Sequence, residues 1–282
     1  MSKTTSRLIA LAAIVLLALA AFLWWRGQQQ PASQPAPVPA AATSASSASR
    51  DILAAAPVAS APAIAHPIEA LDAPELAASA PSGIEGALVD LFGRKRVLSM
   101  FQASDFPHRI VATVDNLGRS DAPAHLWPVN PTPGRFSVLK QAGGNVISPD
   151  NGLRYLPFVL MVESVDPKQL VAFYRRLYPQ LQQAYEDIGF PNRYFNDRLV
   201  EVIDLLLATP TQQGSVKVLL PQINGPVQPK RPWVLYEYED PALRQLSSGQ
   251  KLLLRMGPNN EERMKAKLSE LRKLVASDSP GR

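Results

Sequence analysis

The sequence predicts a mainly α-helical (α+β) domain with a small two-stranded antiparallel β-ribbon, preceded by a transmembrane helix and a disordered linker. Three observations predict this: an uncharged apolar run near the N-terminus, an Ala/Pro/Ser-rich stretch after it, and apolar residues at helical spacing beyond that stretch. The predicted parts are a cytoplasmic N-terminus (1–7), a transmembrane helix (8–25), a disordered linker (26–82) and an α-rich domain (83–282).

The apolar run Leu8–Trp25 contains no charged residue. At about 1.5 Å per residue, a helix of this length spans about 27 Å, close to the roughly 30 Å hydrocarbon core of a bilayer. Lys3 and Arg7 precede the run, whereas only Arg26 follows it closely. This charge bias predicts a single-pass anchor with the N-terminus in the cytoplasm and the domain on the other side of the membrane.

A cleaved signal peptide is the alternative interpretation of this run, because Ala18-Leu19-Ala20 offers a small-residue cleavage site. Cleavage at this site would leave the strongly apolar residues 22–25 exposed to solvent near the new N-terminus. This favours the uncleaved anchor.

The composition excludes several kinds of chemistry. The chain has no cysteine, which excludes disulfides, thiol catalysis and cysteine metal sites. The formal net charge of +5 is mild for 282 residues, and the basic run at 94–96 is short. We therefore expect no nucleic-acid partner.

Ala, Pro and Ser dominate the segment 27–82, which cannot bury enough apolar surface to offset the entropy lost on ordering. It is either a spacer that carries the domain away from the membrane or a tether whose length matters little. Within it, Ile68–Leu76 is the exception, because it has the composition of a helical turn or a short docking segment.

Several local signals divide the domain into helices. Apolar spacing predicts helices over 84–92 and 94–101, and a third over 106–117 capped by Asp105. Asp166-Pro167 marks the start of a long helix that ends at Gly189, and a second helix over 192–208 completes an αα-hairpin.

The C-terminal part combines strands and helices. The β-branched and aromatic runs 216–221 and 233–239 predict the antiparallel ribbon. Asp240-Pro241, either Ser247 or Ser248, and Pro258 each mark the start of a further helix, and Gly257 ends one of them.

The Pro-rich segment HLWPVNPTPGRF (125–136), here named the strap, has two interpretations. Its prolines fix φ and prevent strand pairing, so it would run extended over the core as a brace. Trp127 and Phe136 would then pin its ends, while Asn130 and Arg135 tie its backbone down. Alternatively, its Pro-x-x-Pro spacing makes it a contact surface.

Asp197, Glu201 and Asp204 form the only carboxylate pattern with chemical interest, at i, i+4 and i+7 on one helix. Such a stripe would bind a hard cation or supply an acid/base pair. The pattern is more typical of a solvated helix edge that is salt-bridged to Arg198 and Arg193. The three histidines lack metal-ligand spacing, and no phosphate-binding or nucleophile-elbow motif occurs. We assign no catalytic residue, metal ligand or cofactor.

Four long motifs complete the pattern: LWPVNPTPGRF, NGLRYLPFVLMVESVD, FYRRLYPQLQQAYEDIGFPNRYFNDRLVEVID and RPWVLYEYEDPALRQLSSGQKLLLRMGPNN. Together they resemble a bacterial membrane-anchored family with a domain of unknown function (number three thousand and fourteen). The resemblance covers about residues 85 to 276. It implies an envelope protein of Gram-negative bacteria with one N-terminal anchor, and it implies no activity.

We therefore expect a non-enzymatic interaction or scaffold module in the periplasm, held at the bacterial inner membrane through Leu8–Trp25. An envelope protein or the cell wall is the expected partner. The candidate contact residues lie in the strap and between the two long helices. They are Asn130, Arg135, Asn192, Arg193 and Tyr194.

The alternative from another class is a cell-wall-directed hydrolase or transferase that uses Asp197, Glu201 and Asp204. Glycosidase chemistry needs two carboxylates roughly 5 to 10 Å apart across a cleft, and one or two helical turns give such a separation. A third interpretation is a purely structural membrane-proximal spacer.

Overall fold

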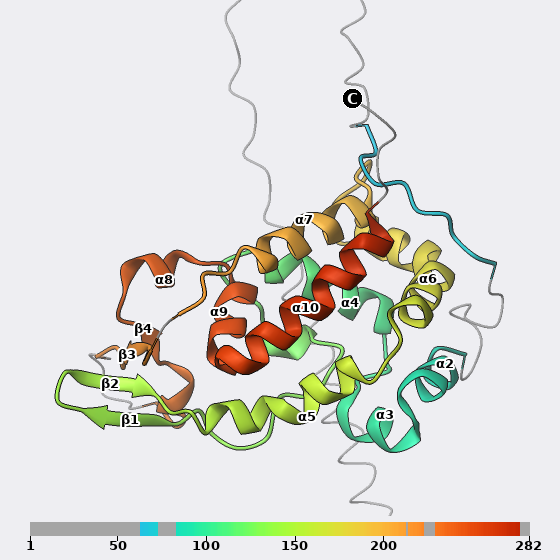
Figure 1. Ribbon diagram of the computed structural model, residues 1–282. Helices are drawn as coiled ribbons and strands as arrows, with labels where there is room; N and C mark the ends of the chain where they lie inside the picture. Colours follow the sequence, from blue (N-terminus) through green and yellow to red (C-terminus); the bar gives the residue numbers. More distant parts are fainter. Residues whose placement is uncertain (1–62, 73–82, 213, 223–228, 277–282) are drawn as a thin grey trace, which may run out of the picture. The chain divides into compact units, whose positions relative to one another are not determined.

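The computed structural model describes residues 63–72, 83–212, 214–222 and 229–276 (Figure 1). All of them belong to one unit, Pro57–Arg282. The predicted transmembrane helix and most of the predicted linker lie outside the described residues. Within the described ranges, no helix has the length and apolar character needed to cross a membrane.

The unit is mostly helical, as the sequence predicts, with a small antiparallel sheet at one end (Figure 1). The helices are α2 (Gly83–Phe92), α3 (Arg94–Met100), α4 (Phe106–Leu117), α5 (Asn151–Glu163), α6 (Pro167–Asp187), α7 (Phe195–Leu207), α8 (Pro241–Gln245), α9 (Ser248–Met256) and α10 (Pro258–Val275). The described residues also form the short 3₁₀ helices η2 (Ala124–Leu126) and η3 (Pro232–Val234).

Three of the predicted helix starts are confirmed by their capping bonds. The Asp166 side chain accepts a hydrogen bond from the backbone N–H of Gln169, and Asp240 accepts one from Ala242. Ser247 and Gln250 form a reciprocal capping box at the start of α9. Each bond satisfies an amide that the first helical turn would otherwise leave unpaired.

The predicted cap at Asp105 is wrong. Asp105 has a left-handed backbone (φ 54°), and its side chain makes no capping hydrogen bond. Its carboxylate lies instead 2.7 Å from Nδ1 of His108, one turn into α4. The left-handed geometry turns the side chain away from the helix amides, and the histidine provides another partner.

The sheet has four strands in the order β1-β2-β3-β4, all antiparallel. They are β1 (Val138–Gln141), β2 (Gly144–Ile147), β3 (Lys217–Leu219) and β4 (Glu237–Tyr238). The predicted pairing of the last two is confirmed, with Val218 opposite Tyr238. The prediction of only two strands is wrong, because a hairpin that turns at Ala142-Gly143 adds β1 and β2.

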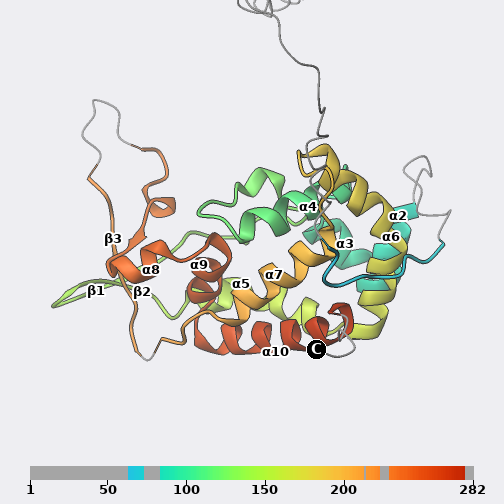
Figure 2. The ribbon, with the colours of Figure 1, turned by 90° about the horizontal axis from the view of Figure 1, so that it is seen from above.

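Most of the core lies between the helices, and a smaller buried cluster of Val218, Tyr238, Leu243 and Leu254 lies beside the sheet. The largest buried cluster joins side chains of α2, α3, α4, α5 and α6 with Phe195, the first residue of α7. Helix α10 packs against α5, α6, α7 and α9, and closes the helical layer (Figures 1 and 2).

Helix α9 approaches α4 and α7 closely at Gly249. A Cβ added there would lie 2.9 Å from the carbonyl oxygen of Leu117 and 2.6 Å from Cδ2 of Leu206. Next to it, Ser248 donates two hydrogen bonds of 2.7 Å, from its hydroxyl to the carbonyl of Asn116 in α4 and from its amide to the carbonyl of Arg119 just after α4. Only a residue without a side chain fits this crossing.

The strap is tied to the helices by backbone and side-chain hydrogen bonds. Asn130 donates to the carbonyls of Met100 (2.7 Å, backbone) and Ser99 (3.0 Å, side chain) at the end of α3. The guanidinium of Arg109 donates to the carbonyls of His125 and Trp127. These bonds favour the brace interpretation for the N-terminal half of the strap.

One part of the predicted linker belongs to the folded unit. Residues 63–72 run along α6 and α7, and Ile68 packs against two of the buried clusters. The assignment of all of 26–82 to a disordered linker is therefore wrong for this segment, whereas the docking alternative considered for Ile68–Leu76 agrees with the contacts of Ile68 and Leu71. The contacts come from residues more than a hundred positions away in the chain.

Candidate functional site

The five candidate contact residues do not form one surface. Asn130 contacts the end of α3, and Arg135 lies over the ring of Trp233. Tyr194 contacts Ile68, while Asn192 and Arg193 remain exposed in the loop between α6 and α7. Two separate regions therefore need description: the surface around Arg135 and the groove beside Tyr194.

The first region, here named the Arg135–Trp233 surface, comprises Arg135, Phe136, Trp233, Tyr236 and Arg255. The guanidinium carbon of Arg135 lies 4.2 Å from the centroid of the Trp233 ring. The rings of Phe136 and Tyr236 have centroids 5.8 Å apart. Three segments that are distant in sequence thus contribute alternating rings and cations to one surface.

Arg255 fixes the base of this surface. Its Nη2 donates a 3.0 Å hydrogen bond to the carbonyl of Tyr236, and its guanidinium lies 5.8 Å from the Phe136 ring and 5.7 Å from that of Tyr238. Since α9 carries Arg255, the helix holds the end of the strap against β4. Cation–π contacts of this kind hold the rings in place.

The outer part of the Arg135–Trp233 surface is exposed. Arg135 is exposed, Trp233 is half-buried, and the neighbouring Val234 retains 60% of its accessible area. Lys230 and Arg231, just before η3, are exposed as well. The region therefore combines apolar rings with positive charge, and it suits a partner with carboxylates beside apolar or ring-shaped groups.

Of this surface, the sequence prediction singled out Arg135 as a contact residue but missed Trp233. Residues 233–239 were predicted as one strand, yet Pro232–Val234 forms a 3₁₀ turn that turns the indole toward Arg135. Proline at 232 lacks an amide hydrogen for a strand ladder, and this signal was available in the sequence.

The second region, here named the linker groove, comprises Arg175 of α6 and Tyr194, Asn196 and Asp197 at the start of α7. The carboxylate of Asp197 accepts hydrogen bonds from the amides of Ala65 (3.0 Å) and His66 (2.7 Å). Nδ2 of Asn196 donates to the carbonyl of His66 at 2.8 Å. These side chains therefore bind the backbone of the docked segment.

Tyr194 and Arg175 continue this pattern along the segment. The hydroxyl of Tyr194 accepts from the amide of Ile68 (2.9 Å) and donates to its carbonyl (3.1 Å). Arg175 donates from Nε to the carbonyl of Glu69 and from Nη2 to its carboxylate, at 2.8 and 2.7 Å. Tyr194, predicted as a contact residue, thus contacts the chain's own linker segment.

The three carboxylates of the acidic stripe serve different partners. Asp197 binds the docked segment, Glu201 lies 2.8 Å from Nη1 of Arg198, and Asp204 accepts hydrogen bonds from Arg272 of α10. Among the described residues, no group of His, Asp and Glu side chains is arranged to hold a metal ion. The stripe therefore offers no pair of carboxylates that face each other across a cleft.

The Asp204–Arg272 pair predicts a pH-dependent contribution to stability. The hydrogen bond from Arg272 holds the pKa of Asp204 below its ordinary value of 3.8. Because the folded-state pKa is the lower one, the contribution is present above about pH 4 and is lost as the pH falls through the folded pKa. The Asp204 side chain is 46% exposed, so we expect Asp204→Asn to cost well under about 1 kcal/mol at pH 7.

Urea unfolding of wild type and Asp204→Asn at pH 7 and pH 3 measures this contribution. The difference in free energy of unfolding between the two proteins should be larger at pH 7. An equal difference at both pH values would contradict the assignment.

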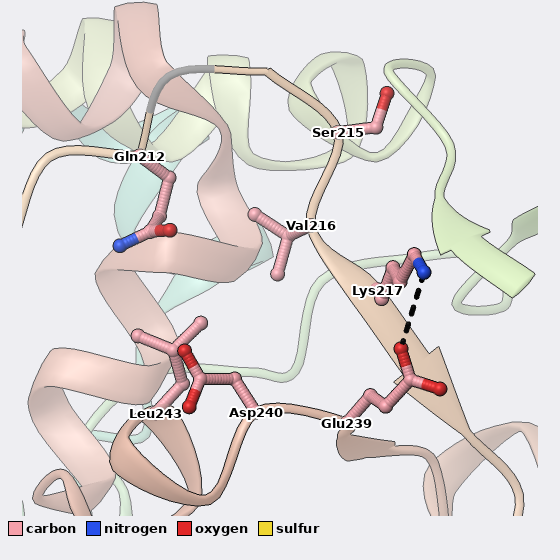
Figure 3. Close-up of a pocket in the computed structure, with 7 residues that line it drawn as sticks. All are labelled: Gln212, Ser215, Val216, Lys217, Glu239, Asp240 and Leu243. Carbon is pink, nitrogen blue, oxygen red and sulfur yellow. Dashed lines mark ion pairs between the residues drawn. The ribbon is translucent and has the colours of Figure 1, made fainter. Parts of the chain in front are cut away.

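A small pocket of about 270 Å³ lies beside β3 and α8 (Figure 3). Val216 and Leu243 form its apolar wall, and Lys217 lies 3.7 Å from Glu239 at its rim. The Asp240 carboxylate accepts the amide hydrogen bond that caps α8. The charged groups of this pocket are thus engaged in ion pairing and helix capping, and we assign it no chemistry.

Comparison with known proteins gives one match. A family model described as "Protein of unknown function (DUF3014)" matches residues 106–272. These residues include the Arg135–Trp233 surface and the side chains of the linker groove. No curated protein and no solved structure matches the chain.

Proposed function

The chain belongs to the family of proteins of unknown function DUF3014, and we propose that it is a non-enzymatic interaction module tethered to the bacterial inner membrane. In this proposal Leu8–Trp25 is the anchor and the folded unit lies in the periplasm. The uncharged apolar run and the positive charge before it support the anchor and its orientation.

One observation carries the interaction proposal, namely the Arg135–Trp233 surface. Tryptophan, tyrosine and arginine are the residues that most often dominate binding energy at protein interfaces. Here they come from the strap, the η3–β4 segment and α9, and they are held in position by cation–π contacts. Such a preorganised surface loses little conformational entropy on binding.

The chemistry of this surface favours a cell-wall partner. Half-buried rings pack against the apolar faces of sugars, and adjacent guanidinium groups bind carboxylates through paired hydrogen bonds. The cell-wall polymer carries both sugars and carboxylates. An acidic envelope protein is the second partner, favoured by the exposed Val234 and by the four cations at 135, 230, 231 and 255.

We expect Arg135→Ala and Trp233→Ala each to weaken binding to isolated wall sacculi about tenfold, as expected for loss of a central anchor. Because Arg135 is exposed, its substitution should leave the melting temperature unchanged. Cosedimentation of the purified full chain in detergent with sacculi measures this. Lys168→Ala is the control, because Lys168 is an exposed cation of α6, and this helix lies away from the sheet (Figure 1).

In-cell photocrosslinking separates the two partners. A crosslinking residue at Val234 keeps the rings and arginines intact, and the same residue at Lys168 is the comparison site. A discrete protein adduct at 234, lost on Arg135→Ala, identifies an envelope protein. Identical adducts at both sites, together with unchanged cosedimentation of both alanine variants, would contradict the proposal.

A further inference from the structure

The linker groove binds residues 65–71 as a protein binds a peptide ligand. Apart from the amide of Leu71, which donates to the carbonyl of Arg175 at 3.1 Å, every hydrogen bond given above joins a groove side chain to the segment. The partners lie over a hundred positions apart in the chain. The segment therefore owes its place to the groove and not to local chain geometry.

The groove also recognises side chains. Ile68 packs against the buried residues of both neighbouring clusters, and the Glu69 carboxylate pairs with Arg175. Between the amides bound by Asp197 and by Tyr194 stands Pro67, which has no amide hydrogen to satisfy. The groove thus contacts the side chains of Ile68 and Glu69 and the backbone of residues 65–69.

The buried side of the groove is built to accept this ligand. Asn196 is fully buried, and its Nδ2 divides its two donors between the carbonyls of His66 and Val275. Its Oδ1 accepts from the hydroxyl of Tyr174, whose pKa burial raises far above the ordinary value, so this hydroxyl stays a donor. The carbonyl of His66 thus supplies the partner of one of the two Asn196 donors.

The docked segment itself is only shallowly bound. Ala65 and Glu69 are exposed, and Ile68 is half-buried. Shallow burial with many backbone hydrogen bonds is typical of exchangeable peptide complexes and not of a protein core. Residues 73–82, which join the segment to α2, span at most about 35 Å when extended.

We propose that the linker groove is a peptide-binding site, and that the Ala65–Leu71 segment of a second copy of this chain binds there in trans. The fit between segment and groove is the one observed within a single copy, so an identical segment from another copy makes the same contacts. In cis the segment has a high effective concentration, and pairing between copies therefore requires that they be held close together. This site is distinct from the Arg135–Trp233 surface and does not depend on its role.

Complementation between two full-length variants tests the exchange. The first variant carries Ile68→Asp, which breaks the segment and leaves the groove intact. The second carries Tyr194→Phe and Asp197→Ala, which break the groove and leave the segment intact; Phe preserves the ring contact with Tyr178. Only a mixed pair then combines an intact groove with an intact segment.

The tagged Ile68→Asp chain is mixed with an untagged partner in shared detergent micelles or vesicles. We expect it to capture the untagged groove variant about tenfold better than it captures the untagged Ile68→Asp chain. A fluorescent peptide of residues 62–72 provides the second measurement. It should bind the Ile68→Asp chain saturably, and adding Asp197→Ala should abolish binding. Wild type should bind it more weakly, because its own segment competes.

Peptide binding to the Ile68→Asp chain also shows that its groove is folded. If the peptide binds the Ile68→Asp chain but this chain does not capture the groove variant, the proposed exchange of segments between copies would be overturned. A chain with a native melting profile that binds no peptide would overturn the peptide-binding site itself.

Discussion

Replacing Asn196 with Ala is expected to lower the free energy of unfolding by about 3 kcal/mol, because it leaves several buried polar groups without partners. The Asn196 side chain accepts from the Tyr174 hydroxyl and donates to the carbonyls of Val275 and His66, at 2.8 to 3.0 Å. It therefore joins α6, the end of α10 and the docked segment at one buried position. An apolar replacement satisfies none of them.

Chemical denaturation of the full chain, followed by far-UV circular dichroism, measures this loss. Asn259→Ala is the matched control, since Asn259 is exposed in the first turn of α10 and should change stability by less than about 0.5 kcal/mol. If both substitutions had similarly small effects, Asn196 would not be the buried junction described above.

The second large effect is expected at Gly249. Gly249→Ala should destabilise the fold by about 2 to 3 kcal/mol, because the new Cβ would lie 2.9 Å from the carbonyl oxygen of Leu117. The Leu206 side chain can move aside, but that backbone carbonyl belongs to the last turn of α4. Relief would require α9 to move away from α4, which stretches the hydrogen bonds of Ser248.

Gly86→Ala is the matched control for this substitution. Gly86 lies in α2 with nothing within 4 Å of an added Cβ, so alanine should stabilise the helix by about 0.5 to 1 kcal/mol. The two Gly→Ala changes are thus expected to have opposite signs in thermal unfolding. A stabilising Gly249→Ala would show that α9 does not pack against α4 as described.

The helices were predictable because their signals are local. Asp166, Asp240 and Ser247 each bind an amide two or three residues along the chain, and apolar spacing identifies the buried face. The β1–β2 hairpin was missed because its strands are four residues each and only Val146 is buried, so their sequence does not alternate clearly. Its pairing with β3 depends on residues far along the chain.

The candidate sites were predicted only in part for the same reason. Arg135 and Tyr194 were identified from their positions in loops, but their partners Trp233 and Ile68 are distant in sequence. Asp197 was considered for catalysis because spacing alone cannot show that its carboxylate binds two backbone amides. The family was recognisable from its long motifs, and the match over 106–272 confirms it.

The docked segment also determines where mechanical load enters the folded unit. Along the chain, any tension applied through the residues before 63 reaches the contacts of Asp197 and Asn196 before it reaches α2. Those contacts connect to α7 and to the end of α10. A force applied to the N-terminal part would therefore first act on these side-chain contacts. The force would reach α2 and α3 only after the segment had dissociated from the groove.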